Sequence, residues 1–354
     1  MDLKYWRYEL RLTDTWRIAS NLDSGGKTAH PVVFVELTAP DGLQGYGESA
    51  PSHRYLETVD TVVEFLHRVD ATRLSFQDIP ASLEYLDALA PGHHAARAAL
   101  DVALWDGAAR AVAKPVHDLL GLGFSEGRHR TAFSIGISSP PRIREKVLNA
   151  AAFPILKLKL GSERDHENLA ALRSAAPDKP LMVDANEAWQ TKEAALNNLE
   201  WLADDGRILL VEQPMPATAA TADLAWLKAR TPLPLFADES CRFESDIVAC
   251  AAGFHGVNVK LVKCGGIYWA MKMLQAAQRA GLKTMLGCMI ESSLLISAAA
   301  HLAELADYLD LDGNLLIAND PFEGVTAEQG QLSFARCAQP KGLRVRMRSG
   351  SCSK

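Results

Sequence analysis

Residues 131–310 alternate short apolar segments with stretches of helical periodicity, and this alternation limits the folds open to the chain more than any other feature. The apolar segments have the length and composition of buried strands. They span residues 131–137, 154–160, 181–184, 208–212, 234–238, 256–260, 283–287 and, more weakly, 307–310. Strands that alternate with helices form a parallel sheet, and eight of them can close into a barrel. An open doubly wound sheet is the alternative, but no G-x-G-x-x-G motif opens any of the helices.

The preceding part of the chain predicts a small α+β domain. Three segments have the sequence pattern of antiparallel strands, either in the order of their apolar and polar residues or in the turn that precedes them. They span residues 4–12, 31–37 and 44–48. A polar loop of roughly residues 13–30 separates the first two, and its length indicates a functional or mobile segment. Helical periodicity follows over residues 58–68 and 95–112, and the small residues of the second helix predict close packing. The strand-like residues 343–348 suggest that the last segment returns to this domain.

Composition excludes several classes of partner. The net charge of −6 leaves no basic surface for nucleic acid or for an anionic membrane. No apolar run approaches the roughly 20 residues that span a bilayer, and the first residues lack the pattern of a signal peptide. The six cysteines show no C-x-x-C pair and no zinc spacing, so we expect reduced thiols and a cytoplasmic protein.

Three consecutive strands of the predicted barrel end in a carboxylate. These residues are Asp184, Glu212 and Asp238, and the spacings of 28 and 26 residues correspond to one strand–helix unit each. The carboxyl ends of barrel strands meet at one face, so the three side chains converge. Each acid alone would suit a strand-end cap or an ion pair. Three together repel one another unless a cation binds, and an all-oxygen site favours Mg²⁺, with Mn²⁺ as an alternative.

Lysines end two further strands. Side chains alternate along a strand, so Lys157 and Lys159 point to the same side, together with Ile155. If that side is buried, repulsion and desolvation favour a neutral amine that can act as a base; an edge strand with solvated lysines is the alternative. Lys260 ends the sixth strand, on the opposite side of an eight-stranded barrel from Lys159. Lys263 is a rival, but its place beside two glycines suggests a loop. Two bases on opposite faces of a carbon indicate racemisation or epimerisation next to a metal-bound carboxylate, through an enediolate-like intermediate.

These residues lie in short motifs that occur in order at the predicted strand ends. The motifs are K-x-K at 157–159, D-A-N at 184–186, E-Q-P at 212–214, A-D-E-S at 237–240 and N-V-K at 258–260. With them the chain resembles the enolase superfamily, in its muconate-lactonizing subgroup, over nearly its whole length. The resemblance implies an α/β fold, a (β/α)₇β modified TIM barrel at residues 126–320 under an α+β capping domain at residues 1–125, with 321–354 packing back on it.

The resemblance also implies roles for individual residues. Asp184, Glu212 and Asp238 would bind one Mg²⁺ per subunit, and Lys159 and Lys260 would form the acid/base pair. Lys157 would help to hold the substrate carboxylate. Barrels of this family assemble into homo-oligomers, and we expect the same here.

The eighth strand carries Asp310-Leu311-Asp312, which is similar to the D-x-D of dipeptide epimerases. There the two carboxylates bind the free ammonium group of the substrate, a role that suits two acids pointing into one site. A turn that caps the strand end is the alternative. Met289-Ile290-Glu291 fits the same pattern, so we count Glu291 among the substrate-binding residues. Muconate cycloisomerases, o-succinylbenzoate synthases and N-acylamino acid racemases act on substrates without this ammonium group and remain the alternative activities.

The side chain of the epimerised residue is expected to meet the first loop of the capping domain. Ala-Glu epimerases are similar in placing an arginine there, and Asn21 stands at the position expected for it. Arg17 and Lys27 are the other candidates in the loop. We therefore predict Asn21 and Arg17 as substrate-binding residues, and leave open whether the side chain is acidic. A barrel that only binds a partner would require a broken catalytic set, which this sequence does not have.

Overall fold

The computed structural model describes residues 1–350, and its first element is a three-stranded antiparallel sheet with strand order β1-β2-β3. The strands are β1 (Asp2–Trp16), β2 (Lys27–Thr38) and β3 (Gln44–Ser49). Helices α1 (Val59–Arg68) and α3 (His94–Ala111) pack on one face of this sheet, and α2 (Ile79–Leu89) packs against α3. The three predicted strands and two predicted helices are confirmed, whereas α2 was not predicted. We call this unit the cap.

Small residues set the distance between α3 and the sheet. A Cβ atom at Gly47 of β3 would overlap the carbonyl oxygen of Ala99, and one at Gly45 would overlap that of Ala103. Glycine is therefore required at both strand positions, because any side chain would push the helix away. The close packing that the small residues predict is confirmed.

The loop between β1 and β2 is shorter than predicted. The strands pair with an irregularity between Arg11 and Trp16, and Trp16 still faces Lys27. The loop therefore spans residues 17–26 rather than 13–30, and it contains the short 3-10 helix η1 (Ala19–Asn21). The prediction was wrong because polar residues can continue an antiparallel pair that runs beyond the apolar core.

Eight parallel strands form the larger unit, in the spatial order β4 to β11. They are β4 (Phe133–Ile135), β5 (Leu156–Lys159), β6 (Leu181–Asp184), β7 (Ile208–Glu212), β8 (Leu235–Ala237), β9 (Gly256–Val259), β10 (Lys283–Gly287) and β11 (Tyr308–Asp310). A parallel bridge from Thr131 to Leu309 joins the first strand to the last, so the sheet closes. Every predicted strand is confirmed, and so is the modified TIM barrel with its separate cap.

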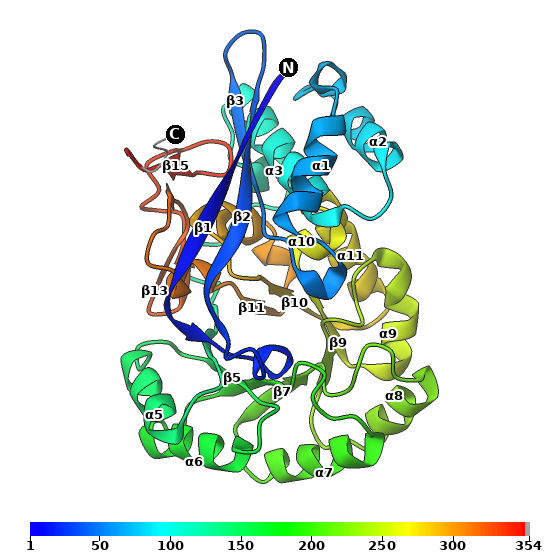
Figure 1. The fold of residues 1–354 in the computed structure, drawn as a ribbon, viewed down its shortest axis with the longest axis vertical. Helices are drawn as coiled ribbons and strands as arrows, with labels where there is room; N and C mark the ends of the chain where they lie inside the picture. Colours follow the sequence, from blue (N-terminus) through cyan, green and yellow to red (C-terminus); the bar gives the residue numbers. More distant parts are fainter. Residues whose placement is uncertain (351–354) are drawn as a thin grey trace.

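Helices follow seven of these strands and surround the barrel (Figure 1). They are α5 (Pro140–Asn149), α6 (Asp165–Ala175), α7 (Lys192–Ala203), α8 (Thr221–Lys228), α9 (Ile247–Gly253), α10 (Leu261–Cys264) with α11 (Ile267–Arg279), and α12 (Ser293–Ala300). A one-turn helix, α4 (Val116–Leu119), lies between the cap and the barrel in sequence. In residues 1–350 no helix combines the length and the apolar character needed to cross a membrane.

Two buried carboxylates of the cap accept hydrogen bonds from the N-termini of barrel helices. Glu48 of β3 accepts from the amide and the hydroxyl of Ser292, at 3.0 and 2.5 Å, at the start of α12. Asp101 of α3 accepts from the amide of Ile267 at 2.5 Å, at the start of α11. Helix N-termini present free amides and a positive dipole end, so they stabilise carboxylates that are out of reach of water. These contacts fix the cap above the barrel.

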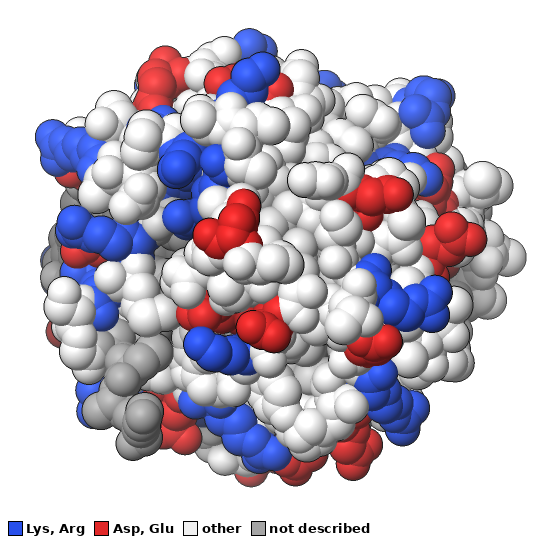
Figure 2. All heavy atoms as spheres, turned by 90° about the horizontal axis from the view of Figure 1, so that it is seen from above, with Lys and Arg blue, Asp and Glu red and all other residues white. Residues whose placement is uncertain are grey.

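The last segment contacts the cap. Its strands are β12 (Phe322–Glu323), β13 (Thr326–Glu328), β14 (Gln331–Ser333) and β15 (Arg346–Met347). The rings of Phe322 and Phe34 lie 5.2 Å apart, and Asp106 of α3 accepts from the amide of Leu343 at 2.8 Å. The domain boundaries at residues 125 and 320 stay predictions, and residues 351–354 of the predicted returning segment lie outside the described residues. Over the face of the molecule in Figure 2, basic and acidic side chains are interspersed.

Candidate active site

The charged residues predicted from strand ends meet beneath the cap. A cavity of about 520 Å³ lies between the carboxyl ends of the barrel strands and two cap segments, residues 16–30 and 52–55. Lys159, Asp238, Lys260, Asp310 and Asp312 line this cavity, and all five are buried. A TIM-type barrel holds its chemistry at this face, because the loops that follow the strands converge there.

Parallel pairing brings the three predicted metal ligands together. Asp184 of β6 is directly opposite Glu212 of β7, and Asp238 follows the neighbouring strand β8. One carboxylate oxygen from each residue lies within 4.8 Å of the other two, and the three residues are at most 2% exposed. An all-oxygen, all-anionic donor set of this size fits a hard divalent cation such as Mg²⁺ and lacks the nitrogen and sulfur ligands that zinc prefers.

The three carboxylates differ in their proton affinity. Burial raises the pKa of all three groups, but the lysines oppose it: Lys260 and Lys263 hold the pKa of Asp238 well below its ordinary value. Lys159 likewise keeps the pKa of Asp184 lowered. Burial and the neighbouring Asp184 raise the pKa of Glu212 to about 7. The triad therefore carries a concentrated negative charge that only cations can balance.

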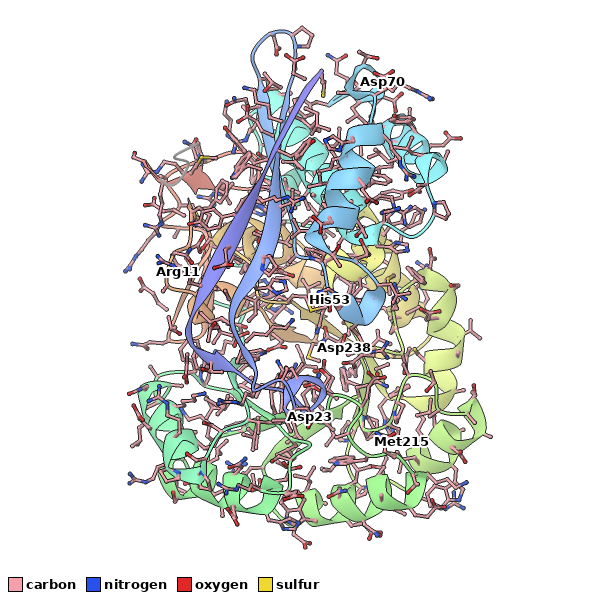
Figure 3. All side chains as sticks on the ribbon, viewed as in Figure 1. Arg11, Asp23, His53, Asp70, Met215 and Asp238 are labelled. Carbon is pink, nitrogen blue, oxygen red and sulfur yellow. The ribbon has the colours of Figure 1, made fainter. Side chains whose placement is uncertain are left out.

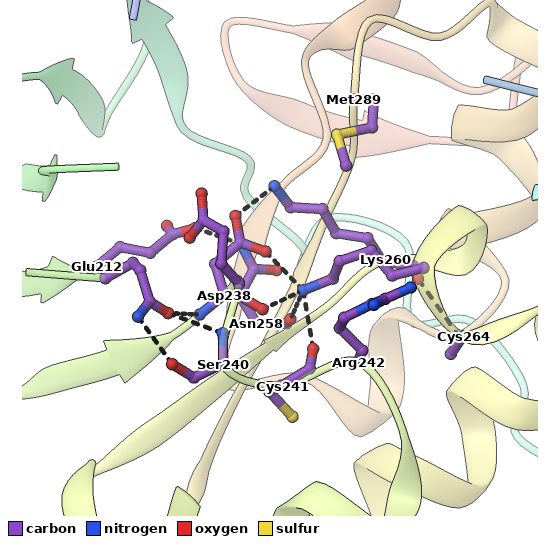
Figure 4. Close-up of polar contacts among 12 residues, drawn as sticks. Glu212, Asp238, Ser240, Cys241, Arg242, Asn258, Lys260, Cys264 and Met289 are labelled. Atoms are coloured by element: carbon purple, nitrogen blue, oxygen red, sulfur yellow. Dashed lines mark hydrogen bonds and ion pairs between the residues drawn. The ribbon is translucent and has the colours of Figure 1, made fainter. Parts of the chain in front are cut away.

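Lys159 and Lys260 approach this triad from opposite sides of the barrel. Lys159 ends β5 and donates to Asp184 at 2.6 Å. Lys260 follows β9 and donates to Asp238 at 2.7 Å, and Figure 4 labels both of these residues. The strands β5 and β9 are four positions apart in an eight-stranded sheet, so the two lysines face each other across the mouth. Burial lowers the pKa of Lys260, but Asp238 and Glu212 outweigh burial and raise it well above its ordinary value.

Lys157 lies below Lys159 and is surrounded by acids. Its ammonium group is 2.6 Å from Asp310, 2.7 Å from Glu212 and 3.2 Å from Asp184, and the side chain is fully buried. Burial alone lowers the pKa of this group, yet the three carboxylates raise it well above its ordinary value. Lys157 is therefore held in its charged form, because the attraction of three acids exceeds the repulsion between two lysines, and its expected role in holding the substrate carboxylate stays a prediction.

Lys263 is buried rather than part of an exposed loop. It lies on the one-turn helix α10 and donates to the side chain of Asp238 and to the carbonyl oxygens of Asp238, Cys241 and Asn258. The loop assignment was wrong because the glycines at 265 and 266 end a helical turn instead of starting a flexible segment. Lys263 thus fixes the orientation of a candidate metal ligand without lining the cavity.

Asp310 and Asp312 both lie on the cavity wall, as expected for a D-x-D at a strand end. Ser134 of β4 links them, since its amide donates to Asp312 at 2.6 Å and its hydroxyl to Asp310 at 3.4 Å. Burial and the charge of Asp310 raise the pKa of Asp312 to about 7. Two adjacent acids in one wall attract a cationic group, because such a group relieves their mutual repulsion.

The other predicted substrate-binding residues are placed differently. Glu291 is buried and accepts from the amide of Met289 at 2.9 Å, and Met289 itself lines the cavity. Asn21 lines the cavity, but its amide group bonds to the amide of Ile18 and the carbonyl of Trp16. Arg17 donates to the carbonyl of Gly25 at 3.0 Å and is not among the residues that line the cavity. The roles of all three stay predictions.

Sequence reasoning missed several residues of the cavity wall. Glu239 is half-buried beside Asp238, and its partial burial together with the charge of Asp238 raises its pKa to about 8. Its place in the A-D-E-S motif was the available signal. Tyr55 and Arg54 reach the cavity from the cap, where Arg242 lies 4.6 Å above the Tyr55 ring and Arg54 pairs with Glu187 through two bonds of 2.7 Å. No sequence signal marked these contacts, because they join segments about 130 residues or more apart.

Comparison with known proteins gives consistent matches over both units. Residues 142–323 match the family model described as enolase C-terminal domain-like, and residues 10–121 match the mandelate racemase / muconate lactonizing enzyme, N-terminal domain. An L-Ala-D/L-amino acid epimerase of Pedosphaera parvula (strain Ellin514) is 57% identical, covering 98% of this chain and 99% of that protein. An L-Ala-D/L-Glu epimerase of Bacteroides thetaiotaomicron (strain VPI-5482) is 39% identical, covering 94% and 85%.

Solved structures agree with this similarity. The dipeptide epimerase of Enterococcus faecalis V583, in complex with Mg and the dipeptide L-Leu-L-Tyr, superposes with a TM-score of 0.88. It is 30% identical in sequence, and the match covers 97% of this chain and 98% of that one. The similarity therefore extends over cap and barrel together.

Proposed function

Because this chain belongs to the mandelate racemase and muconate lactonizing enzyme family of the enolase superfamily, we propose that it is a dipeptide epimerase. In this proposal it inverts the α-carbon of the C-terminal residue of an L,L-dipeptide and depends on Mg²⁺. The observation that carries the proposal is one cavity lined by two opposed lysines, a pair of acids and Asp238, which belongs to the group of three convergent carboxylates.

Each group of residues has a separate task in this reaction. Asp184, Glu212 and Asp238 hold one Mg²⁺ per subunit, with Mn²⁺ as an alternative ion. When bound, the ion would supply positive charge that stabilises the negative charge developing on the substrate carboxylate. Lys157 contributes a fixed positive charge beneath this position. Asp310 and Asp312 bind the free ammonium group of the dipeptide.

Lys159 and Lys260 move the proton. One lysine in its neutral form takes the α-proton from one face of the α-carbon, and the other, as an ammonium group, returns a proton to the opposite face. The placement of the two side chains across the barrel mouth makes both faces of a substrate in between accessible. The enclosure of the cavity by the cap limits proton exchange with bulk water.

The test is incubation of an L,L-dipeptide library with the protein and Mg²⁺ in D₂O. We expect deuterium at the α-carbon of the C-terminal residue, measured by mass spectrometry, together with formation of the L,D epimer. If no dipeptide takes up deuterium, the proposed function is wrong.

A second experiment separates dipeptides from the substrates of related enzymes. Asp312→Asn is the best variant, because within residues 1–350 the Asp312 carboxylate has a hydrogen bond to Ser134 alone, whereas the Asp310 carboxylate also pairs with Lys157. Loss of a charge that binds an ammonium group is expected to raise KM for dipeptides by about tenfold or more. Asp204→Asn, on the exposed end of α7, is the matched control. A muconate cycloisomerase, o-succinylbenzoate synthase or N-acylamino acid racemase would not respond to Asp312→Asn in this way.

The homo-oligomeric state and the cytoplasmic location stay predictions. Light scattering after size-exclusion chromatography measures the first directly.

A further inference from the structure

The E-Q-P motif at residues 212–214 contains a residue to which the proposed reaction assigns no task. Glu212 is one of the three convergent carboxylates, whereas Gln213 is not among the described residues that line the cavity. Gln213 is nevertheless fully buried, with an exposed fraction of 0%. A buried side-chain amide is costly unless its oxygen and its two N–H groups find partners, so the partners of Gln213 indicate its role.

The side-chain amide of Gln213 holds the turn that contains Asp238. Its Oε1 accepts hydrogen bonds from the backbone amides of Asp238 at 3.0 Å and of Ser240 at 3.1 Å. Its Nε2 donates to the hydroxyl of Ser240 and to the carbonyl oxygen of Met215, both at 2.8 Å. Figure 4 labels Asp238 and Ser240, and Figure 3 labels Met215 in the barrel part of the molecule. The oxygen and both N–H groups of the amide are therefore in use.

The backbone of Gln213 lies in the left-handed region, at a φ of +36°, which residues other than glycine rarely adopt. Its amide donates to the carbonyl oxygen of Phe236 at 2.8 Å, as in a parallel ladder. The next bond of a regular parallel ladder would join the amide of Asp238 to the carbonyl oxygen of Gln213. That carbonyl oxygen instead accepts from the amide of Glu187 at 2.9 Å. The side-chain oxygen of Gln213 takes its place at the amide of Asp238.

Gln213 therefore joins the turns of all three carboxylates of the proposed metal site. It directly follows Glu212 in the chain, and its side chain binds the amide of Asp238. Its carbonyl oxygen accepts from Glu187, in the turn that follows Asp184. Sheet pairing already places Asp184 opposite Glu212. The pairing between β7 and β8 ends two residues before Asp238, so the bonds of Gln213 set the distance between Asp238 and Glu212.

Glycine would adopt this backbone conformation without strain, so glutamine at position 213 is explained by what its side chain binds. Resting on the proposed function, we infer that Gln213 is a positioning residue, which holds Asp238 at a distance from Glu212 that suits Mg²⁺ and so sets the selectivity of the site between Mg²⁺ and Ca²⁺. Mg²⁺ requires near-octahedral oxygen ligands at about 2.0–2.1 Å, whereas Ca²⁺ accepts irregular ligands at about 2.3–2.6 Å. A loosened ligand set therefore loses affinity for Mg²⁺ before it loses affinity for Ca²⁺.

The experiment measures the Kd of Mg²⁺ and of Ca²⁺ by calorimetry, with the full chain and without dipeptide. Gln213→Gly removes the side chain and tolerates the backbone conformation, so this variant is expected to fold. Gln213→Met keeps the length of the side chain and removes its hydrogen bonds. In both variants we expect the Kd of Mg²⁺ to rise by about 10–100-fold, as for other residues that orient metal ligands, and the Kd of Ca²⁺ by less than about threefold. Neither substitution changes the net charge, so the change in Kd reports the position of the ligands.

Asn319→Met is the matched control. The side-chain amide of Asn319 also binds backbone groups, since it accepts from the amide of Arg11 at 2.7 Å and donates to the carbonyl oxygen of Glu9 at 2.8 Å. These partners belong to strand β1, and Asn319 is not among the described residues that line the cavity. We expect this variant to lower Tm and to leave the Kd of both ions unchanged.

The outcomes separate this inference from the proposed function. A rise by the same factor in the Kd of Mg²⁺ and of Ca²⁺ would give Gln213 a general structural role and overturn the inference. Unchanged Kd values in the Gln213 variants would overturn it as well. If the selectivity for Mg²⁺ falls as expected but no dipeptide takes up deuterium, the positioning role stands and the proposed function is wrong.

Discussion

At the mouth of the barrel, Asp184, Glu212 and Asp238 are buried beside lysine ammonium groups, whereas at the cap–barrel interface Glu48 and Asp101 are buried against backbone amides. The amides belong to the first turns of α12 and α11. Both arrangements keep carboxylates out of water, but they differ in whether the groups that bind the carboxylate oxygens can move away. Backbone amides are fixed by the helix, while lysine side chains can release their oxygens to a metal ion or a proton.

This difference separates the acidic residues that take part in the proposed reaction from the acidic residues that hold the cap on the barrel. The carboxylates at the mouth share cations that also reach the substrate cavity. Within residues 1–350 neither Glu48 nor Asp101 lines the cavity, and burial raises the pKa of each to about 8. Substitutions at the mouth are therefore expected to change the reaction, and substitutions at the interface to change stability.

The largest expected effect is on turnover. Lys159→Ala and Lys260→Ala are each expected to lower the rate of epimerisation by about 10²–10⁴-fold, because a positioned general acid or base contributes that much. The rate is measured as L,D product formation. Lys192→Ala, which removes a partly buried lysine that pairs with Asp223 away from the cavity, should leave the rate unchanged. Full activity in either active-site variant would contradict the acid/base assignment.

The next effect is on stability. Glu48→Ala leaves the Ser292 amide and the Leu295 amide without an acceptor, so we expect the free energy of unfolding to fall by about 2–4 kcal/mol. The measurement is urea unfolding followed by circular dichroism. Glu64→Ala, on the exposed side of α1, should change it by less than about 0.5 kcal/mol. If Glu48→Ala instead abolished turnover in folded protein, the proposed separation of roles would fail.

Metal binding should distinguish the two groups of acids directly. At a Mg²⁺ concentration 100 times its Kd, the native state gains about 2.7 kcal/mol. We expect this gain, measured as a rise in Tm, to disappear in Asp238→Asn and to remain in Glu48→Gln. Equal shifts in the two variants would show that Mg²⁺ binds elsewhere.

A further effect, spread over several pH units, is on the pH dependence of stability. The pKa of Glu48 lies near 8 in the folded protein and near 4.5 in the unfolded chain, so the folded state holds one more proton between these values. Stability should therefore fall as pH rises through this window, by at most about 1.4 kcal/mol per pH unit for this group. Glu48→Gln removes the contribution of Glu48 to the slope of stability against pH, whereas Asp101 still contributes to that slope. An unchanged slope in Tm against pH would contradict the raised pKa of Glu48.

The sequence by itself determined the barrel and the positions of its chemistry. Strand length, strand–helix alternation and the polar residue at each strand end are local properties, and parallel pairing places all strand ends at one face. Asp184, Glu212, Asp238, Lys159 and Lys260 could therefore be assigned from the sequence to one face of the barrel. The cap strands were predictable for the same reason, although the ends of β1 and β2 depend on pairing beyond the apolar core.

Only the tertiary structure decided the environment of each charge. Lys157 is paired with acids from three other strands, and Lys263 is buried against Asp238, although both have the same residue type as the solvated lysines of the surface. The cavity wall likewise joins the second cap segment and strand β2 to the barrel, although these segments are far apart in the sequence. The pKa and the ligand preference of each residue depend on charges that the fold brings together from distant parts of the chain. A local sequence pattern therefore cannot predict them.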